Sequence, residues 1–148
     1  MPSVRGDRTF SNGLQCFYYI GRFDSTSNMI RLSPEHTYLV HSIQVPNDIK
    51  APAFGLQFRG YLDVPATDIY RFDLTSDDGS VLKIDGETVV NNDGLHSATE
   101  RSGEIALQKG EHFFSLDFIQ GGGDYTLQLK YGRQGGLLQD IPASVLKY

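Results

Sequence analysis

The sequence predicts an all-β fold of the sandwich or barrel type, in one domain spanning residues 1–148. Three observations indicate it. Apolar residues alternate with polar ones over short runs, as in strands that have one face in a core and one in water. Turn signals separate these runs at regular spacing, and the chain holds 16 glycines and 6 prolines. The length of 148 residues suits one domain with its own core.

The first 53 residues contain two expected strands, LQCFYYI and TYLVHSIQV. The polar stretch between them, FDSTSNMIRLSPEH, fits a long loop or a short helical turn. Cys16 lies in the first apolar run and is the only cysteine, so it has no internal disulfide partner. Its apolar surroundings favour a small core residue over a reactive thiol.

From Phe54 onward the apolar residues recur with period two. In YRFDLT, for example, Tyr70, Phe72 and Leu74 share one face of the expected strand. The same alternation returns in SVLKI, FFSLDF and DYTLQLKYG. Glycine permits the positive φ of tight turns, and such turns are expected at Asp85-Gly86, Asp93-Gly94, Lys109-Gly110 and Gly121 to Gly123. The ending, IPASVLKY, is expected to dock as a final short strand.

Charge and hydropathy exclude two classes of partner. The 13 basic and 18 acidic side chains give a formal charge of −5, which repels a phosphate backbone, so nucleic acid is not expected as a partner. No stretch approaches the roughly 20 apolar residues of a membrane-spanning helix. The amino terminus, MPSVRGDRTF, lacks the apolar core of a signal peptide. If the protein is exported, we expect this chain to be a mature fragment or a domain excised from a larger protein.

The segment SDDGSVLKIDG is the most distinctive motif. Asp77 and Asp78 adjoin a glycine, a strand then begins, and a second Asp-Gly turn closes it, which predicts a hairpin with an acidic mouth. Asp-Asp-Gly is common in turns because aspartate side chains accept hydrogen bonds from nearby backbone amides. Taken alone, the motif therefore supports a hairpin and nothing more.

The wider pattern is more specific. The run from Phe54 to Gly132, with SDDGSVLKIDG, VVNNDGLH and IQGGGDY, resembles the protective-antigen-type (PA-fourteen) domain family, and GLQCFYYIGRFD resembles the opening strand of that family. The resemblance thus covers nearly the whole chain, and it is strongest to copies appended to bacterial glycoside hydrolases and other carbohydrate-active proteins. It implies an antiparallel two-sheet β-sandwich.

The resemblance also implies a calcium site. In the calcium-dependent lectins of the family, two aspartates across an unusual cis peptide hold Ca²⁺, which accepts sugar hydroxyls; the matching residues here are Asp77 and Asp78. Calcium takes about 6–8 oxygen ligands, so a second loop must contribute. By position, IQGGGDY offers Gln120 and Asp124, whereas yeast adhesins have an asparagine in this loop. The alternative is that the acidic turn serves hairpin geometry alone.

Further contacts to a sugar are expected around the same mouth. The candidate ligand-binding residues are Asp77, Asp78, Asn92, Asp93, His96, Gly121, Gly122, Gly123 and Tyr125. Several of them have an equally simple structural explanation, since Asn92 and Asp93 are turn formers and His96 could bond to backbone. Tyr125 could stack on a sugar ring or pack in the core, and the chain has no tryptophan to stack instead.

Three functions follow as alternatives. The first is a non-catalytic glycan-binding module, possibly calcium-dependent, within a larger secreted, cell-surface or periplasmic protein. The second is a structural domain that packs against a neighbouring catalytic domain without binding sugar. The third, a glycoside hydrolase, is disfavoured because its two carboxyl groups must flank the scissile bond, and neighbouring aspartates on one turn do not.

Overall fold

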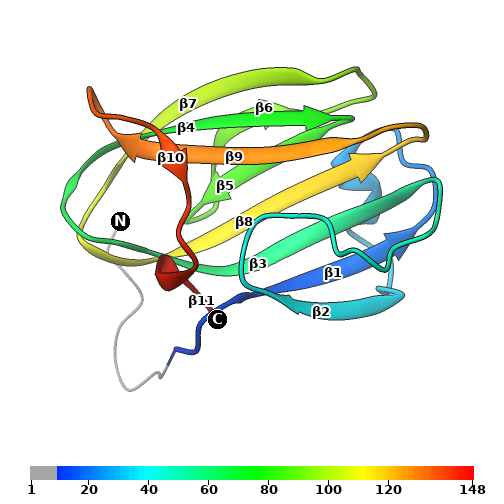
Figure 1. Ribbon diagram of the computed structural model, residues 1–148, viewed down its shortest axis with the longest axis horizontal. Helices are drawn as coiled ribbons and strands as arrows, with labels where there is room; N and C mark the ends of the chain where they lie inside the picture. The colour runs from blue at the N-terminus through cyan, green and yellow to red at the C-terminus, as the bar shows by residue number, and fades with distance from the viewer. Residues whose placement is uncertain (1–9) are drawn as a thin grey trace.

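The computed structural model describes residues 10–148, which form two antiparallel β-sheets packed face to face (Figure 1). The strands are β1 Leu14–Ile20, β2 His36–Val40, β3 Phe54–Val64, β4 Asp68–Asp77, β5 Ser80–Ile84, β6 Glu87–Asn92, β7 Thr99–Leu107, β8 Gly110–Gln120, β9 Thr126–Arg133, β10 Gln139–Asp140 and β11 Leu146–Lys147. Two short 3-10 helices are added, η1 Thr26–Met29 and η2 Ala143–Val145. Residues 1–9, part of the segment in which we predicted no signal-peptide core, lie outside the described residues.

The larger sheet has the order β2-β1-β3-β8-β5-β6, with β11 also paired to β3, and the smaller sheet has the order β10-β9-β4-β7. The predicted antiparallel two-sheet sandwich is therefore confirmed. No helix within residues 10–148 is both long enough and apolar enough to cross a membrane.

The core lies between the two sheets and is built from the alternating residues that the sequence indicated. Tyr70, Phe72 and Leu74 point inward from β4, and each is at most 1% exposed. On the larger sheet, the inward-facing residues of β8 complete this core; they are Phe114, Leu116 and Phe118, all 0% exposed. Each such side chain contributes about 1.5–3 kcal/mol through burial, which makes this double layer the main source of stability. Cys16 is also buried at 0% exposure, as predicted.

A second, smaller core lies on the outer face of the larger sheet. Here η1 covers the sheet with Met29, which packs with Tyr19, Phe23 and Ile119. Gly55 lies beneath it, where a Cβ atom would collide with the Met29 sulfur, so β3 needs a glycine at this point. The predicted helical turn in the polar stretch is thus confirmed, and it fixes the loop between β1 and β2 against the sheet.

The second predicted strand, TYLVHSIQV, is shorter than expected. β2 ends at Val40, which pairs with Leu14, the first residue of β1. Because β2 is an edge strand, it has no further partner beyond that point, and its continuation leaves the sheet. Residues 41–45 instead form a bend that crosses toward the smaller sheet.

The predicted docking of the carboxyl-terminal segment is confirmed. β11 pairs with β3 through Leu146 and Leu62, on the same edge of β3 that β1 occupies further along. Leu146 is 0% exposed and Ile141 is 6% exposed, so both anchor residues enter the core.

Candidate functional site

The acidic pair lies where the chain crosses from one sheet to the other. Asp77 ends β4 in the smaller sheet, and β5 begins at Ser80 in the larger sheet. The predicted hairpin is β5–β6, closed by Asp85 and Gly86, both with positive φ. The aspartate pair stands at the open end of this hairpin, and the peptide bond between Asp77 and Asp78 is cis.

Asp78 ties three loops together. Its Oδ1 accepts a hydrogen bond of 3.0 Å from the backbone N–H of His96, in the loop after β6. Its Oδ2 accepts one of 2.6 Å from the N–H of Gly121, in the loop after β8. Both oxygens retain a lone pair for another partner. One side chain therefore holds the crossover, the β6–β7 loop and the β8–β9 loop in a fixed arrangement.

The glycine after the aspartate pair has a packing role. A Cβ atom on Gly79 would lie 2.5 Å from both the nitrogen and the oxygen of Gly94, so the two backbones approach too closely for any side chain. Backbone bonds reinforce the crossover, since Asp78 N–H donates to Ile119 and Ile119 N–H donates to Gly79. The Asp-Asp-Gly pattern therefore forms a turn and also allows the crossover to approach the β6–β7 loop closely.

The electrostatics of the pair favour a cation. Burial raises the pKa of the Asp77 carboxyl above its usual value, and the charge of Asp78 and a hydrogen bond with it add to the rise. The more distant charge of Asp124 acts in the same direction, whereas His96 lowers the pKa. Adjacent carboxylates that repel in this way are relieved by a positive charge between them.

The β8–β9 loop is braced from within by Gln120, which is 1% exposed. Its Nε2 donates to the carbonyl oxygens of Gly123, at 2.6 Å, and Asp124, at 3.3 Å. Its Oε1 is buried and has no hydrogen-bond partner within the described chain. A buried acceptor without a donor is costly, and it suits an oxygen-seeking cation.

The fit to calcium rests on mixed oxygen donors. Among residues 10–148 no three His, Cys, Asp or Glu side chains gather as a metal-binding group, so the Asp124 carboxylate does not join the aspartate pair in a closed cluster. The candidate oxygen ligands are the carboxylates of Asp77 and Asp78, the amide oxygen of Gln120 and the backbone carbonyls of the β8–β9 loop. These are hard oxygen ligands of the kind that calcium accepts. The recorded contact between this loop and the pair is the Gly121 N–H bond to Asp78, and the carbonyls of Gly121, Gly123 and Asp124 already accept hydrogen bonds.

Asn92 and Asp93, two of the predicted ligand-binding residues, make hydrogen bonds within the protein. Asn92 is 2% exposed, and its Nδ2 donates to Leu74 O, Ser76 Oγ and Thr99 O. Asp93 accepts hydrogen bonds from the N–H and hydroxyl of Thr26, at 2.9 and 3.0 Å. The two residues join the β6–β7 loop to β4 and to η1, and the buried amide of Asn92 is not accessible to a ligand.

His96 is also held by backbone. Its Nε2 lies 2.8 Å from the carbonyl oxygen of Asn92, and its Nδ1 lies 2.7 Å from that of Ser97. The ring shapes the loop that donates to Asp78, which matches the structural explanation weighed for this residue.

Tyr125 stands at the edge of the mouth with 46% of its surface exposed. Its ring forms a T-shaped contact with that of Phe54, with centroids 5.6 Å apart, which holds the ring in place. Gly122 and Gly123, both with positive φ, shape the loop immediately before it.

The structure adds two neighbours that sequence reasoning missed. Arg22 donates from Nη1 to the carbonyl oxygen of Gly121 at 2.7 Å. Leu95, 41% exposed, lies against the same glycine, where a Cβ would be 2.9 Å from its methyl group. Arg22 comes from the loop between β1 and η1, and no local pattern in the sequence connects it with residue 121.

Solved structures with the same fold come from several kinds of protein. The PA14 domain of the MpAFP antifreeze protein is 16% identical, with a TM-score of 0.80, and the match covers 99% of this chain and 96% of that one. The PA14 sugar-binding domain from an RTX adhesin is 18% identical, with a TM-score of 0.80 and coverage of 93% and 98%. The Epithelial Adhesin 9 A domain from Candida glabrata, solved in complex with Galb1-3GlcNAc, is 12% identical, with a TM-score of 0.72 and coverage of 93% and 89%.

Identities this low establish a shared fold and nothing finer. No curated protein sequence matches the chain. The PA14 domain family model, in contrast, matches residues 12–144, which include β1 to β10, the acidic crossover and the three loops around it. The chain therefore belongs to the PA14 domain family.

Proposed function

We propose that this PA14 domain is a non-catalytic glycan-binding module whose ligand site is the mouth between the Asp77–Asp78 crossover and the β8–β9 loop. One observation carries the proposal: Asp78 holds three loops together, and the exposed Tyr125 precedes Thr126, the strand partner of Asp77. A sugar needs directional polar groups near a flat apolar surface, and both are present here. The sugar-binding domain of the RTX adhesin and the adhesin domain bound to Galb1-3GlcNAc share this fold, which supports the same use.

We further propose that calcium completes the site. The aspartate pair supplies two carboxylates, and the unpartnered Oε1 of Gln120 supplies an amide oxygen. Asp124 is exposed and raises the pKa of Asp77, so its carboxylate is a further donor within electrostatic reach. A bound calcium ion would offer open coordination positions to sugar hydroxyls, while the protein side chains fix where those positions point.

The same geometry disfavours catalysis. Asp77 and Asp78 are consecutive residues on one crossover, whereas glycosidases place two carboxyl groups about 5–9.5 Å apart on opposite sides of the scissile bond. We infer an accessory role, in which the module serves a larger exported protein and binds glycan for its neighbouring domains.

A glycan array tests the binding proposal, with Galb1-3GlcNAc among its sugars, in millimolar calcium and again after EDTA. We expect weak binding that EDTA abolishes. Absence of any bound glycan in calcium would overturn the glycan proposal, and binding that persists in EDTA would overturn the calcium proposal alone. Calorimetry with calcium chloride and no sugar measures the ion separately.

The matched variants are Asp77→Asn and Asp68→Asn. Asp77→Asn removes one carboxylate charge at the mouth and leaves both Asp78 loop bonds intact, so we expect loss of calcium and glycan binding with the fold retained. Asp68→Asn removes the same charge from a partly exposed residue paired with Arg133, and we expect no effect on binding.

A further inference from the structure

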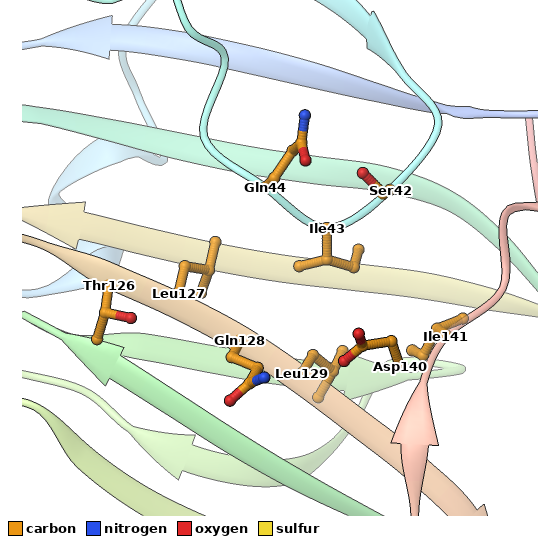
Figure 2. Close-up of a pocket in the computed structure, with 9 residues that line it drawn as sticks. All are labelled: Ser42, Ile43, Gln44, Thr126, Leu127, Gln128, Leu129, Asp140 and Ile141. Carbon is orange, nitrogen blue, oxygen red and sulfur yellow. The ribbon is translucent and has the colours of Figure 1, made fainter.

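A groove of about 410 Å³ lies along the side of the sandwich and begins at Thr126, the strand partner of Asp77. One wall is the edge of β9 from Thr126 to Leu129, and the other is the bend at Ser42, Ile43 and Gln44. Figure 2 shows this bend passing opposite β9, with Ile43 directed toward Leu127 and Leu129. The volume falls within the range of about 300–1,000 Å³ that is typical of ligand sites.

The β9 wall is an open strand edge. β10 pairs with β9 only at Tyr131 and Lys130, after which the chain turns away. Gln134 N–H donates to Ile69 O, and this pair has the same register as the β4–β9 ladder. Because hydrogen-bonded pairs alternate along an antiparallel ladder, the even-numbered residues of β9 are the ones whose backbone groups bond to β4. The N–H and C=O groups of Leu127 and Leu129 therefore face the groove. Outside the sheet ladders, no backbone bond within residues 10–148 reaches either leucine.

This edge lacks the usual protection against strand pairing. Natural edge strands are commonly blocked by lysine, proline, a bulge or a covering segment. The stretch TLQL carries no charge and no proline, and its pairing with β4 is regular. The unpaired backbone groups of such an edge have the same spacing as the backbone groups of an extended peptide, so the two can pair.

The side chains of the groove specify what an added strand would contain. Leu127 and Leu129 face the sandwich interior with Ile43 and Ile141, whereas Gln128 points outward. An extended segment paired to this edge would direct every second residue onto these aliphatic groups. Asp140 is the only charged residue in the lining, so a neutral or basic segment is favoured.

We propose that the β9 edge binds an extended peptide segment of a partner polypeptide by antiparallel strand addition, with aliphatic residues at alternate positions facing Ile43. β10 already pairs antiparallel to β9, so the added segment continues the same ladder. Main-chain bonds to Leu127 and Leu129 give affinity, and the aliphatic floor gives selectivity. The lining shares no residue with the proposed glycan site, although Thr126 adjoins that site, so each proposal is tested with its own ligand.

The probe is a capped nine-residue peptide of alternating threonine and valine, with lysine at each end. In antiparallel pairing the valines that face Ile43 lie opposite Leu127 and Leu129, so their own N–H groups point at β9. N-methylation of the valine nitrogens should therefore weaken binding at least about tenfold, since about two hydrogen bonds are lost. The threonine nitrogens face solvent in this pairing, so their N-methylation should leave binding unchanged.

Amide NMR of the 1–148 chain is the readout. Without peptide, the amides of Leu127 and Leu129 should exchange with solvent faster than those of Gln128 and Lys130; with peptide, they should shift and become protected. Ile43→Arg should block binding by filling the groove, and Leu137→Arg is the matched control, since Leu137 is 94% exposed and outside the groove.

Four results would overturn the proposal: no shift at millimolar peptide, equal binding by both N-methylated peptides, a self-associated dimer that uses this edge and resists the peptide, or perturbation of these amides by a glycan alone. The peptide series keeps the test decisive even if Ile43→Arg loses stability, because it needs no protein variant.

Discussion

The carboxylate of Asp78 and the backbone N–H of Gly121 are 43 residues apart in the chain and 2.6 Å apart in the structure. This bond fixes the β8–β9 loop to the crossover, and the second Asp78 oxygen holds the β6–β7 loop at His96. The acidic motif is thus a structural junction before any ligand arrives. Structural and ligand roles therefore have to be separated by experiments on different atoms of the same motif.

Asp78→Ala should lower the free energy of unfolding by about 1–3 kcal/mol, because two loop N–H groups lose their acceptor. Urea unfolding measures the change. Asp77→Asn is the comparison, because the two loop hydrogen bonds are made by Asp78, and it should change stability little while removing calcium binding. Equal loss of stability in both variants would contradict this division of roles.

Gly79→Ala should destabilise the protein by roughly 1–3 kcal/mol, because its Cβ would stand 2.5 Å from the backbone of Gly94 and neither segment has room to move. Gly136→Ala provides a control at a glycine whose nearest neighbour would be 3.2 Å away. Thermal unfolding of the two variants should differ clearly; matching melting temperatures would show that the loops can separate at no cost.

Asn92→Ala and Tyr125→Ala should separate stability from binding. Asn92 donates to three acceptors in a buried position, so its loss should cost about 1–3 kcal/mol of stability. Tyr125 is 46% exposed, so its truncation should reduce glycan binding with a much smaller loss of stability. Calorimetry measures glycan binding and urea unfolding measures stability for both variants. If Asn92→Ala lost glycan binding while keeping its stability, Asn92 would be a ligand contact.

Cys16 should make stability fall with alkaline pH. Burial raises the pKa of its thiol from 9.0 to about 12, so above pH 9.0 the unfolded chain releases a proton that the folded chain keeps. Unfolding is favoured as pH rises through this window, by up to about 1.4 kcal/mol per pH unit from this group. Urea unfolding above pH 9.0 should show a steeper decline for the native chain than for Cys16→Ala. The folded thiol should also resist alkylation there, and rapid labelling would show that it is accessible.

Periodicity was enough to predict most of the long strands, because a half-buried strand must alternate its residues, but it did not indicate β7 or β10. LQCFYYI corresponds to β1, and the alternation of Tyr70, Phe72 and Leu74 gives the core face of β4. The early end of β2 was not predictable in this way, because the sequence does not show that Val40 pairs with Leu14, the first residue of β1.

The site was predictable only in part. Asp77 and Asp78 stood out because a local motif carries them, and the family resemblance placed them beside the β8–β9 loop. The burial of Asn92 and the approach of Arg22 to Gly121 depend on pairings across 16 to 99 residues, for which a single sequence holds no signal. Turn-forming residues such as Asp93 look identical whether they bond to Thr26 or to a ligand.

The pairing of β11 with β3 also determines where the described chain enters and leaves the domain. Ser11 and Tyr148 exchange two backbone hydrogen bonds of 3.0 and 2.9 Å beside β11, so both ends of the described chain leave from one point. Leu62, the β11 partner, is eight residues along β3 from Phe54, which pairs with Gln120 at the mouth, a separation of about 27 Å. The described chain thus enters and leaves the fold at a point remote from the mouth, an arrangement that is compatible with insertion of the module into a surface loop of a host with the acidic mouth directed away from it.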